Sequence, residues 1–184
     1  MRVYYDTEFW ERGAGYPVSP ISVGMVAEDG REFYAINRDA RWDCFDENGW
    51  LRDNVMPHLP GKRTNWGFRV DRDHPAVMSK KIMRQRLVEF LMDTSDIELW
   101  AWYGAYDHVV LCQLFGAMVD LPPYMPKWTN DLRQETFRLG DVKLPPATGD
   151  EHHALADARW VRKSFHALVE YADSMGYTRP GRAV

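Results

Sequence analysis

The residues that follow Ala154 limit the possible folds more than any other part of the sequence. Apolar residues recur there at steps of three and four, which predicts an amphipathic helix. Asp157 lies on the apolar side of this helix, where an unpaired buried carboxylate would be costly. We therefore expect Asp157 to be neutralised, ion-paired or bound to a metal. The apolar residues are Ala154, Ala158, Val161, Phe165, Leu168 and Ala172.

Two histidines precede this predicted helix. His152 lies five residues before Asp157, an offset of about 140° on a continuous helix, so the two could not share a helical face. We expect His152 to lie at the helix entrance and to reach back. An alternative is that Thr148 and Glu151 form a capping box, which would start the helix earlier and include His152. His153 is interpreted as an exposed residue at the helix start, although an alternative register would exchange its role with that of His152.

Carboxylates occupy similar settings in two other segments. The stretch from Arg2 to Phe9 has the composition of a strand, and the alternation of side chains puts Asp6 and Glu8 on one face. A strand over residues 97–102 and a helix from Ala105 are predicted next. Asp107 falls in the first turn of that helix, on the side of Val110, Leu111, Leu114 and Met118. All three segments thus present carboxylates that need a cation.

These three segments resemble the three motifs of the DEDDh 3′-5′ exonucleases, which include RNase T and oligoribonuclease. The motifs are Asp6-x-Glu8, Tyr106-Asp107 and His152-x-Ala154-Leu155-x-Asp157-Ala158. The closest likeness is to a branch of small actinobacterial exoribonucleases. The resemblance covers essentially the whole chain and implies one domain, residues 1–184, with an α/β RNase H-like fold: a mixed β-sheet flanked by α-helices.

The chemistry of phosphodiester hydrolysis explains this set of residues. Two divalent ions about 4 Å apart can stabilise both the attacking and the leaving oxygen, and Mg²⁺ or Mn²⁺ prefers carboxylate oxygens. The resemblance implies two Mg²⁺ ions, which Mn²⁺ can replace. It implies that Asp6 bridges them, that Glu8 and Asp157 hold the ion that activates water, and that Asp107 holds the other. His152 would be the general base, and its ordinary pKa of about 6.5 suits that role.

Several aromatic residues beside the motifs are candidate substrate contacts: Phe9, Trp10, Tyr103 and Tyr106. Phe9 and Trp10 would stack on the terminal bases, with burial in the core as the alternative interpretation. Tyr103 stands where many relatives have Asn. A further stretch interleaves basic and aromatic residues, a composition suited to stacking bases and steadying phosphates, although its aromatics could equally form a small satellite core. Its members are Lys62, Arg63, Trp66, Phe68, Arg69 and Arg72.

The net charge of −4 matches the four motif carboxylates, which two divalent ions would neutralise. We therefore expect local contacts near one strand end rather than a broad basic face. The expected partner is single-stranded or 3′-overhanging nucleic acid, with RNA favoured by the resemblance, and a homodimer is expected from the same relatives. The alternatives are a DNA exonuclease and a catalytically inactive nucleic-acid-binding module. A structural zinc site is disfavoured, because His152 and His153 with two distant cysteines make a poor ligand set.

The composition supports a folded chain. Of its 184 residues, 45% are hydrophobic and 14% aromatic, and no apolar run approaches the ~20 residues of a membrane span. We expect a soluble, cytoplasmic protein without a membrane partner, whose cysteines, Cys44 and Cys112, are free thiols. Asp29-Gly30 predicts a hairpin between strands at 21–27 and 32–36. Ser79 is expected to cap a helix that reaches about Met92. Residues 41–75 are expected to be irregular, apart from a short helix at 47–56 that Pro57 ends.

Overall fold

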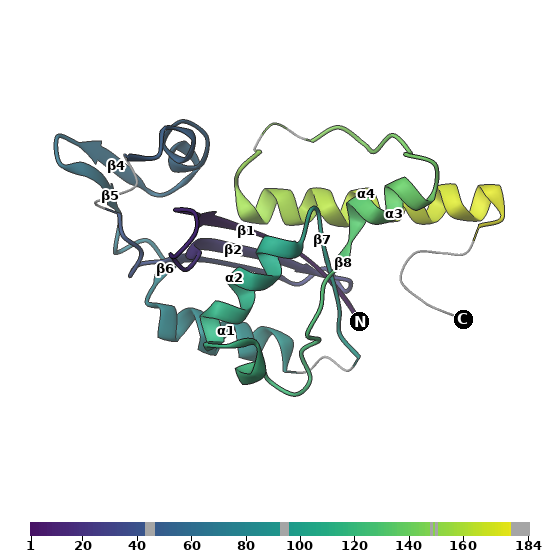
Figure 1. Ribbon diagram of the computed structural model, residues 1–184, viewed down its shortest axis with the longest axis horizontal. Helices are drawn as coiled ribbons and strands as arrows, with labels where there is room; N and C mark the ends of the chain where they lie inside the picture. The colour runs from purple at the N-terminus through teal and green to yellow at the C-terminus, as the bar shows by residue number, and fades with distance from the viewer. Residues whose placement is uncertain (43–46, 93–95, 148, 150, 178–184) are drawn as a thin grey trace.

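A six-stranded mixed sheet forms the centre of the molecule (Figure 1). The computed structural model describes residues 1–42, 47–92, 96–147, 149 and 151–177. The strand order is β6-β3-β2-β1-β7-β8; β1, β2 and β3 are antiparallel neighbours, β7 runs parallel to β1, β8 parallel to β7, and β6 parallel to β3. The strands are β1 (Arg2–Trp10), β2 (Ser19–Ala27), β3 (Glu32–Asn37), β6 (Val77–Met78), β7 (Glu98–Ala101) and β8 (Asn130–Asp131).

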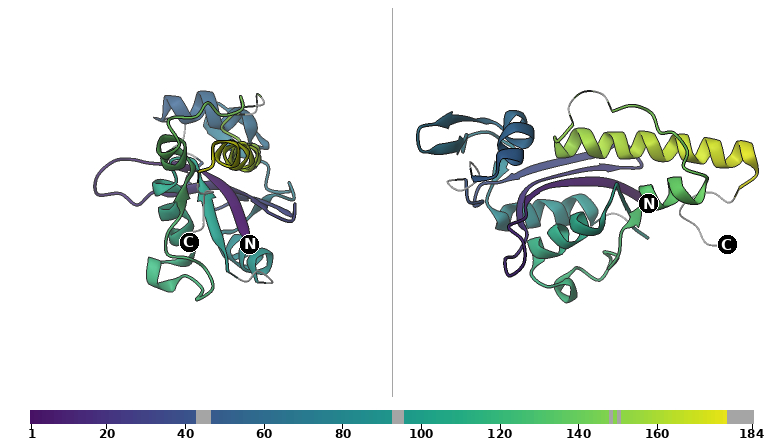
Figure 2. Two further views of the ribbon diagram at one scale, coloured as in Figure 1. Left: turned by 90° about the vertical axis from the view of Figure 1, so that its right-hand side faces the viewer. Right: turned by 45° about the horizontal axis from the view of Figure 1, so that its top comes forward.

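Helices cover both faces of the sheet (Figures 1 and 2). The long helix α4 lies across one face with α3 beside it, and α1 and α2 lie against the other. The chain is therefore an α/β protein with a mixed sheet flanked by helices, consistent with the predicted RNase H-like fold. The helices are α1 (Lys80–Leu91), α2 (Ala105–Phe115), α3 (Leu132–Arg138) and α4 (Ala154–Met175).

The predicted helix and hairpin signals are confirmed. The Ser79 side chain accepts a hydrogen bond from the Ile82 backbone N–H at 3.3 Å and begins α1. Gly30, with φ at +92°, turns the chain between β2 and β3. All six apolar residues that predicted α4 are buried. Because α4 begins at Ala154, the alternative that placed His152 inside it is wrong; Thr148 lies outside the described residues.

Gly24 allows α4 to approach the sheet closely. It pairs with Asp6 across β1 and β2. A Cβ atom at Gly24 would lie 2.3 Å from the carbonyl carbon of Ala154 and from the backbone nitrogen of Leu155, a distance that real contacts do not reach. The first turn of α4 therefore rests directly on the backbone of β2, beside Asp6.

The segment from 41 to 75 departs from its prediction. Leu51–Val55 forms a π-helical turn and Met56–His58 a 3-10 turn, so Pro57 lies inside a helical turn instead of ending one. The expectation of an irregular chain is wrong for 61–70, where β4 (Gly61–Thr64) and β5 (Gly67–Val70) form a separate hairpin. Strands of four residues with mostly polar side chains gave too weak a pattern to predict.

Three smaller findings complete the description. Met118 does not continue the inner face of α2, because Gly116, with φ at +135°, ends that helix and leaves Met118 half exposed. Cys112 is a buried free thiol, while Cys44 lies outside the described residues. Among the described helices, none is long and apolar enough to cross a membrane.

Candidate active site

Three of the four predicted metal-ligand carboxylates converge on one point. Asp6 and Glu8 share a face of β1, as the alternation of the strand predicted, and Asp157 reaches them from the first turn of α4. One carboxylate oxygen from each residue lies within 4.8 Å of the other two. The three donors come from chain segments about 150 residues apart, so their convergence is a property of the fold and not of local sequence.

Asp107 reaches the same cleft from α2, and its carboxylate accepts hydrogen bonds from the edge of β1. Strand β7 pairs with β1 only at residues 2–4, so in the described part of the chain no strand pairs with that edge of β1 beyond Tyr4. The Asp107 carboxylate takes that place, because its Oδ1 accepts hydrogen bonds from the Thr7 backbone N–H at 2.8 Å and from the Thr7 hydroxyl at 2.7 Å. Only 5% of Asp107 is exposed.

The electrostatics of this cluster favour a bound cation. Burial, followed by repulsion from Asp107, holds the pKa of Asp6 well above its ordinary range. Burial, followed by repulsion from Asp157, raises the pKa of Glu8 to about 8. Burial also raises the pKa of Asp107 to about 6, against the opposing effect of its Thr7 hydrogen bonds, and raises the pKa of Asp157. A divalent cation would relieve both the desolvation and the repulsion.

His152 lies at the entrance of α4 and lines the cleft, as predicted. Its backbone N–H donates to Oδ2 of Asp157 at 2.8 Å, and its φ of +68° places it in the left-handed region. Its ring and that of Trp50 form a T-shaped contact with a centroid separation of 4.8 Å. His153 has a different place: its Nδ1 accepts from the Ala156 backbone N–H at 3.3 Å, capping α4, and its ring stacks on Tyr34.

Aromatic residues surround the carboxylates. The cleft has a volume of about 320 Å³. Phe9 and Tyr106 stack with their ring centroids 5.6 Å apart and 8° between their planes, and the Tyr106 hydroxyl donates to Glu11 at 2.9 Å. Tyr103, with φ at +55°, is 62% exposed. The lining residues are Asp6, Thr7, Glu8, Phe9, Trp50, Trp102, Tyr103, Tyr106, Asp107, His152 and Asp157.

Trp10 is the one predicted contact that the structure places in the core instead of the cleft. It follows Glu8 by two residues, beyond the irregularity in the pairing of β1 with β2 between Glu8 and Phe9. The turns at 51–58 and strand β5 cover it there, so that only 5% of Trp10 is exposed. Of the two interpretations of Trp10, the buried core aromatic is the one that the structure supports, whereas Phe9 faces the cleft.

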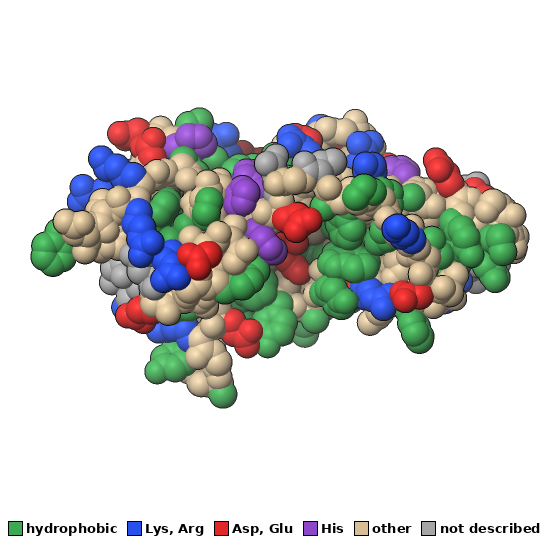
Figure 3. Space-filling view, turned by 90° about the horizontal axis from the view of Figure 1, so that it is seen from above, with side chains coloured by type: hydrophobic (Ala, Val, Ile, Leu, Met, Phe, Trp, Pro, Cys, Tyr) green, Lys and Arg blue, Asp and Glu red, His purple; other side chains and the backbone are tan. Residues whose placement is uncertain are grey.

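Four residues that form or support the site were not predicted from the sequence. Trp50 and Trp102 line the cleft, Thr7 holds Asp107, and Gly24 admits α4. Thr7 could have been found by asking what accepts the backbone hydrogen bonds of β1 beyond the residues that pair with β7. Trp50 could not, because only tertiary packing brings its segment beside α4. In the view from above, His and acidic side chains meet near the centre of the face (Figure 3).

Comparison with known proteins assigns a class to this fold and cleft. Residues 1–169 match the model of the Rv2179c-like 3′-5′ exoribonuclease domain family. The chain belongs to this family and is an exonuclease. Two of its relatives are the proteins named 3′-5′ exoribonuclease Rv2179c and 3′-5′ exoribonuclease MT2234.1, from Mycobacterium tuberculosis strains H37Rv and CDC 1551. Each is 42% identical to this chain over 177 residues, which cover 95% of this chain and 96% of the relative.

Proposed function

We propose that this protein is a metal-dependent 3′-5′ exoribonuclease of the DEDDh type, which removes nucleotides from the 3′ end of single-stranded or 3′-overhanging RNA. The observation that carries the proposal is the convergence of Asp6, Glu8 and Asp157 within 4.8 Å in one cleft with Asp107 and His152. The family membership supports the direction of cleavage and the preference for RNA.

The donor set fits magnesium. Its members are carboxylates only, the hard oxygen ligands that Mg²⁺ and Mn²⁺ prefer, and their raised pKa values identify a site that favours positive charge. Asp6, Glu8, Asp107 and Asp157 would hold two Mg²⁺ ions. When bound, such ions stabilise negative charge on the attacking and leaving oxygens of the phosphodiester.

His152 is the proposed general base. Its backbone is fixed by the hydrogen bond to Asp157, so its ring stays at the cleft while the carboxylate remains available to a cation. The ring makes a T-shaped contact with Trp50. A neutral imidazole can accept the proton of an attacking water and pass it on.

The aromatic rim of the cleft is the proposed site for the terminal nucleotides. Phe9 comes from β1, Tyr103 from the turn before α2 and Tyr106 from the first turn of α2; Tyr103 and Tyr106 are well exposed. Exposed rings stack on any base, which suits an enzyme that shortens strands of varied sequence. We also propose a homodimer, from the resemblance of the motifs to RNase T and oligoribonuclease. Light scattering after size-exclusion chromatography would test it.

The proposal is tested by a time course on matched single-stranded RNA and DNA, each labelled at the 5′ end, with Mg²⁺, Mn²⁺ or EDTA. Wild type is compared with Asp6→Asn and with Glu170→Gln, which neutralises an exposed carboxylate near the far end of α4, roughly 20 Å along the helix from Asp157. We expect a metal-dependent RNA ladder that shortens from the 3′ end for wild type and Glu170→Gln. Asp6→Asn should lose at least about 100-fold of this activity, more than the loss of groups that only orient ligands.

Three other outcomes of this time course would change the proposal. Faster shortening of DNA would assign the enzyme to DNA. Binding of both strands without cleavage would favour an inactive nucleic-acid-binding module. Cleavage that persists in EDTA would contradict the metal-dependent mechanism.

A further inference from the structure

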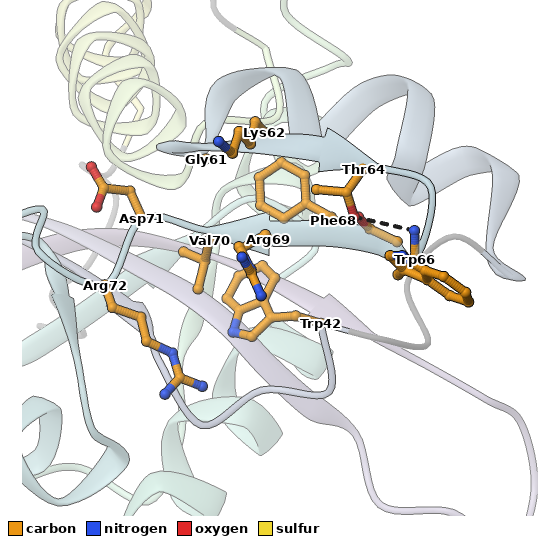
Figure 4. Close-up of a pocket in the computed structure, with 11 residues that line it drawn as sticks. Trp42, Gly61, Lys62, Thr64, Trp66, Phe68, Arg69, Val70, Asp71 and Arg72 are labelled. Carbon is orange, nitrogen blue, oxygen red and sulfur yellow. Dashed lines mark hydrogen bonds between the residues drawn. The ribbon is translucent and has the colours of Figure 1, made fainter.

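The hairpin of β4 and β5 carries a concentration of positive charge on an acidic protein. The residues from 61 to 72 include four basic side chains and one acidic one, whereas the whole chain has a net charge of −4. Lys62, Arg69 and Arg72 line an open groove of about 1010 Å³, and among the described residues that line it Asp71 is the only acidic one (Figure 4). In the view from above, basic side chains gather at the end of the molecule where the hairpin lies (Figure 3).

The two faces of the hairpin have different roles. Phe68 and Val70 are buried and pack with the core residues around Trp42. The cross-strand register pairs Lys62 with Arg69, so these two side chains share the opposite face, where both are exposed. Trp66 lies at the tip and is 91% exposed. The aromatics that the sequence placed together are thus divided: Phe68 holds the hairpin to the core, and Trp66 faces solvent.

The Lys62 and Arg69 pair gives the outer face a local excess of positive charge. Like charges directly opposite each other destabilise an antiparallel pair. In the part of the chain that the structure describes, no carboxylate forms an ion pair with either side chain. An anion between the two side chains would remove the repulsion. The neighbouring exposed Trp66 adds a flat ring of the kind that nucleobases stack on.

The hairpin is continuous with the wall of the active-site cleft. Trp50, which contacts His152, begins the helical turns at 51–58, and these turns lead directly into β4. Leu51 and Val55 of the turns pack in the same core cluster as Phe68 and Val70. The turns lie between the hairpin and the start of α4 (Figure 1). A strand whose 3′ end occupies the cleft can therefore pass over Trp50 toward the hairpin.

We propose that the outer face of the β4–β5 hairpin binds the sugar-phosphate backbone and one base of the RNA strand, on the 5′ side of the nucleotides in the cleft. Lys62, Arg69 and Arg72 contact phosphates, and Trp66 stacks on a base. This inference rests on the proposed exoribonuclease function. It predicts that the hairpin sets how strongly the enzyme holds long strands.

The test separates binding from cleavage. Anisotropy of a fluorescein-labelled single-stranded RNA of about 16 nucleotides, the upper end of common single-strand site sizes, is measured in EDTA at several salt concentrations. The double variant Lys62→Gln with Arg69→Gln should bind more weakly, and its plot of log affinity against log salt should be less steep by about 0.7 for each cation removed. Trp66→Ala should weaken binding about five-fold or more.

Kinetics with Mg²⁺ provide the second readout. The Lys62 and Arg69 double variant should raise KM for the long RNA more than for a dinucleotide, which is too short to reach the hairpin. The matched controls are Arg86→Gln with Lys163→Gln, which remove two exposed cations elsewhere, and Trp128→Ala, which removes another exposed tryptophan. These controls should bind and cleave like wild type.

Two results would overturn the inference. One is that the hairpin variants and the controls bind long RNA equally. The other is that the hairpin variants change the oligomeric state in sedimentation without changing RNA affinity, which would assign this face to a second copy of the chain. Neither result would affect the 3′ ladder that tests the proposed function, and loss of that ladder would leave the binding measurement valid.

Discussion

Two residues of the site have backbone conformations that residues other than glycine rarely adopt. Tyr103 and His152 both adopt left-handed backbone conformations, which cost about 1–3 kcal/mol for residues other than glycine. Both line the cleft. Burial, followed by repulsion from the neighbouring carboxylates, raises the pKa values of Asp6 and Glu8. Backbone strain at two residues and carboxylate repulsion at two others meet in this one cleft, which marks it as the binding site.

Replacing each of the two adjacent histidines should have a different effect. We expect His152→Ala to lower kcat about 100-fold or more, the usual contribution of a general base. Metal affinity should stay near that of wild type, because the bond to Asp157 comes from the His152 backbone. His153→Ala should keep most of kcat but lower the melting temperature, since loss of a helix cap costs about 1 kcal/mol.

Steady-state kinetics at saturating Mg²⁺ and a thermal titration with the metal distinguish the two variants. A His152→Ala enzyme with unaltered kcat would move the base to His153 or to no histidine.

Among the elements, those with long, regular patterns could be predicted and those formed by distant contacts could not. The stripe from Ala154 to Ala172 and the Ser79 cap fixed the helices, because each is a local property. The burial of Trp10 depends on turns that lie some 40 residues further along the chain. The sequence left Trp10 as either a substrate contact or a core aromatic, because it could not show which segment covers that side chain. Likewise, the motif carboxylates were predicted individually, whereas their convergence required the fold.

The contact between α4 and β2 gives a prediction at the scale of elements. Gly24→Ala would place a methyl group against the backbone of Ala154 and push the start of α4 away from the sheet. Asp157 would then move from Asp6 and Glu8, so metal-dependent cleavage should fall at least about 10-fold. Overpacking of this kind also destabilises proteins by about 1–3 kcal/mol.

Thermal melting and cleavage assays with added Mg²⁺ would measure both effects. Gly49→Ala is the matched control, because the nearest atom to its Cβ, at 3.4 Å, belongs to the flexible Arg52 side chain. Equal behaviour of the two variants would show that the close approach of α4 is not required.

At the scale of the whole molecule, the acidic site couples folding to pH and to metal. Its donors come from β1, α2 and α4, so the site exists only when the sheet and both helix layers are assembled. The pKa of Glu8 rises from 4.5 to about 8 on folding, and those of Asp6 and Asp157 also rise. Between these pH values, the folded protein binds more protons than the unfolded chain.

The third prediction is the direction in which the free energy of unfolding changes with pH. Without metal, the free energy of unfolding should fall as the pH rises from about 4.5 to about 8, because the unfolded carboxyls release their protons first. The loss should reach several kcal/mol, or about 5–10 °C in melting temperature. Mg²⁺ should therefore raise the melting temperature more at pH 8 than at pH 5, since it stabilises the ionised carboxylates.

Differential scanning calorimetry in EDTA and in Mg²⁺ across this pH range would measure the effect. Glu8→Gln should flatten the dependence on pH. A melting temperature in EDTA that does not vary between these pH values would contradict the electrostatic description of the site.

The hydrogen bonds from Thr7 to Asp107 have a consequence for the solubility of this exonuclease. A strand edge with free N–H and C=O groups is a template for pairing with another chain. Asp107 occupies that edge of β1 where β7 ends, so the carboxylate both serves the cleft and protects the central strand of the sheet from intermolecular pairing. Substitutions that remove the Asp107 carboxylate are therefore expected both to inactivate the enzyme and to promote its aggregation.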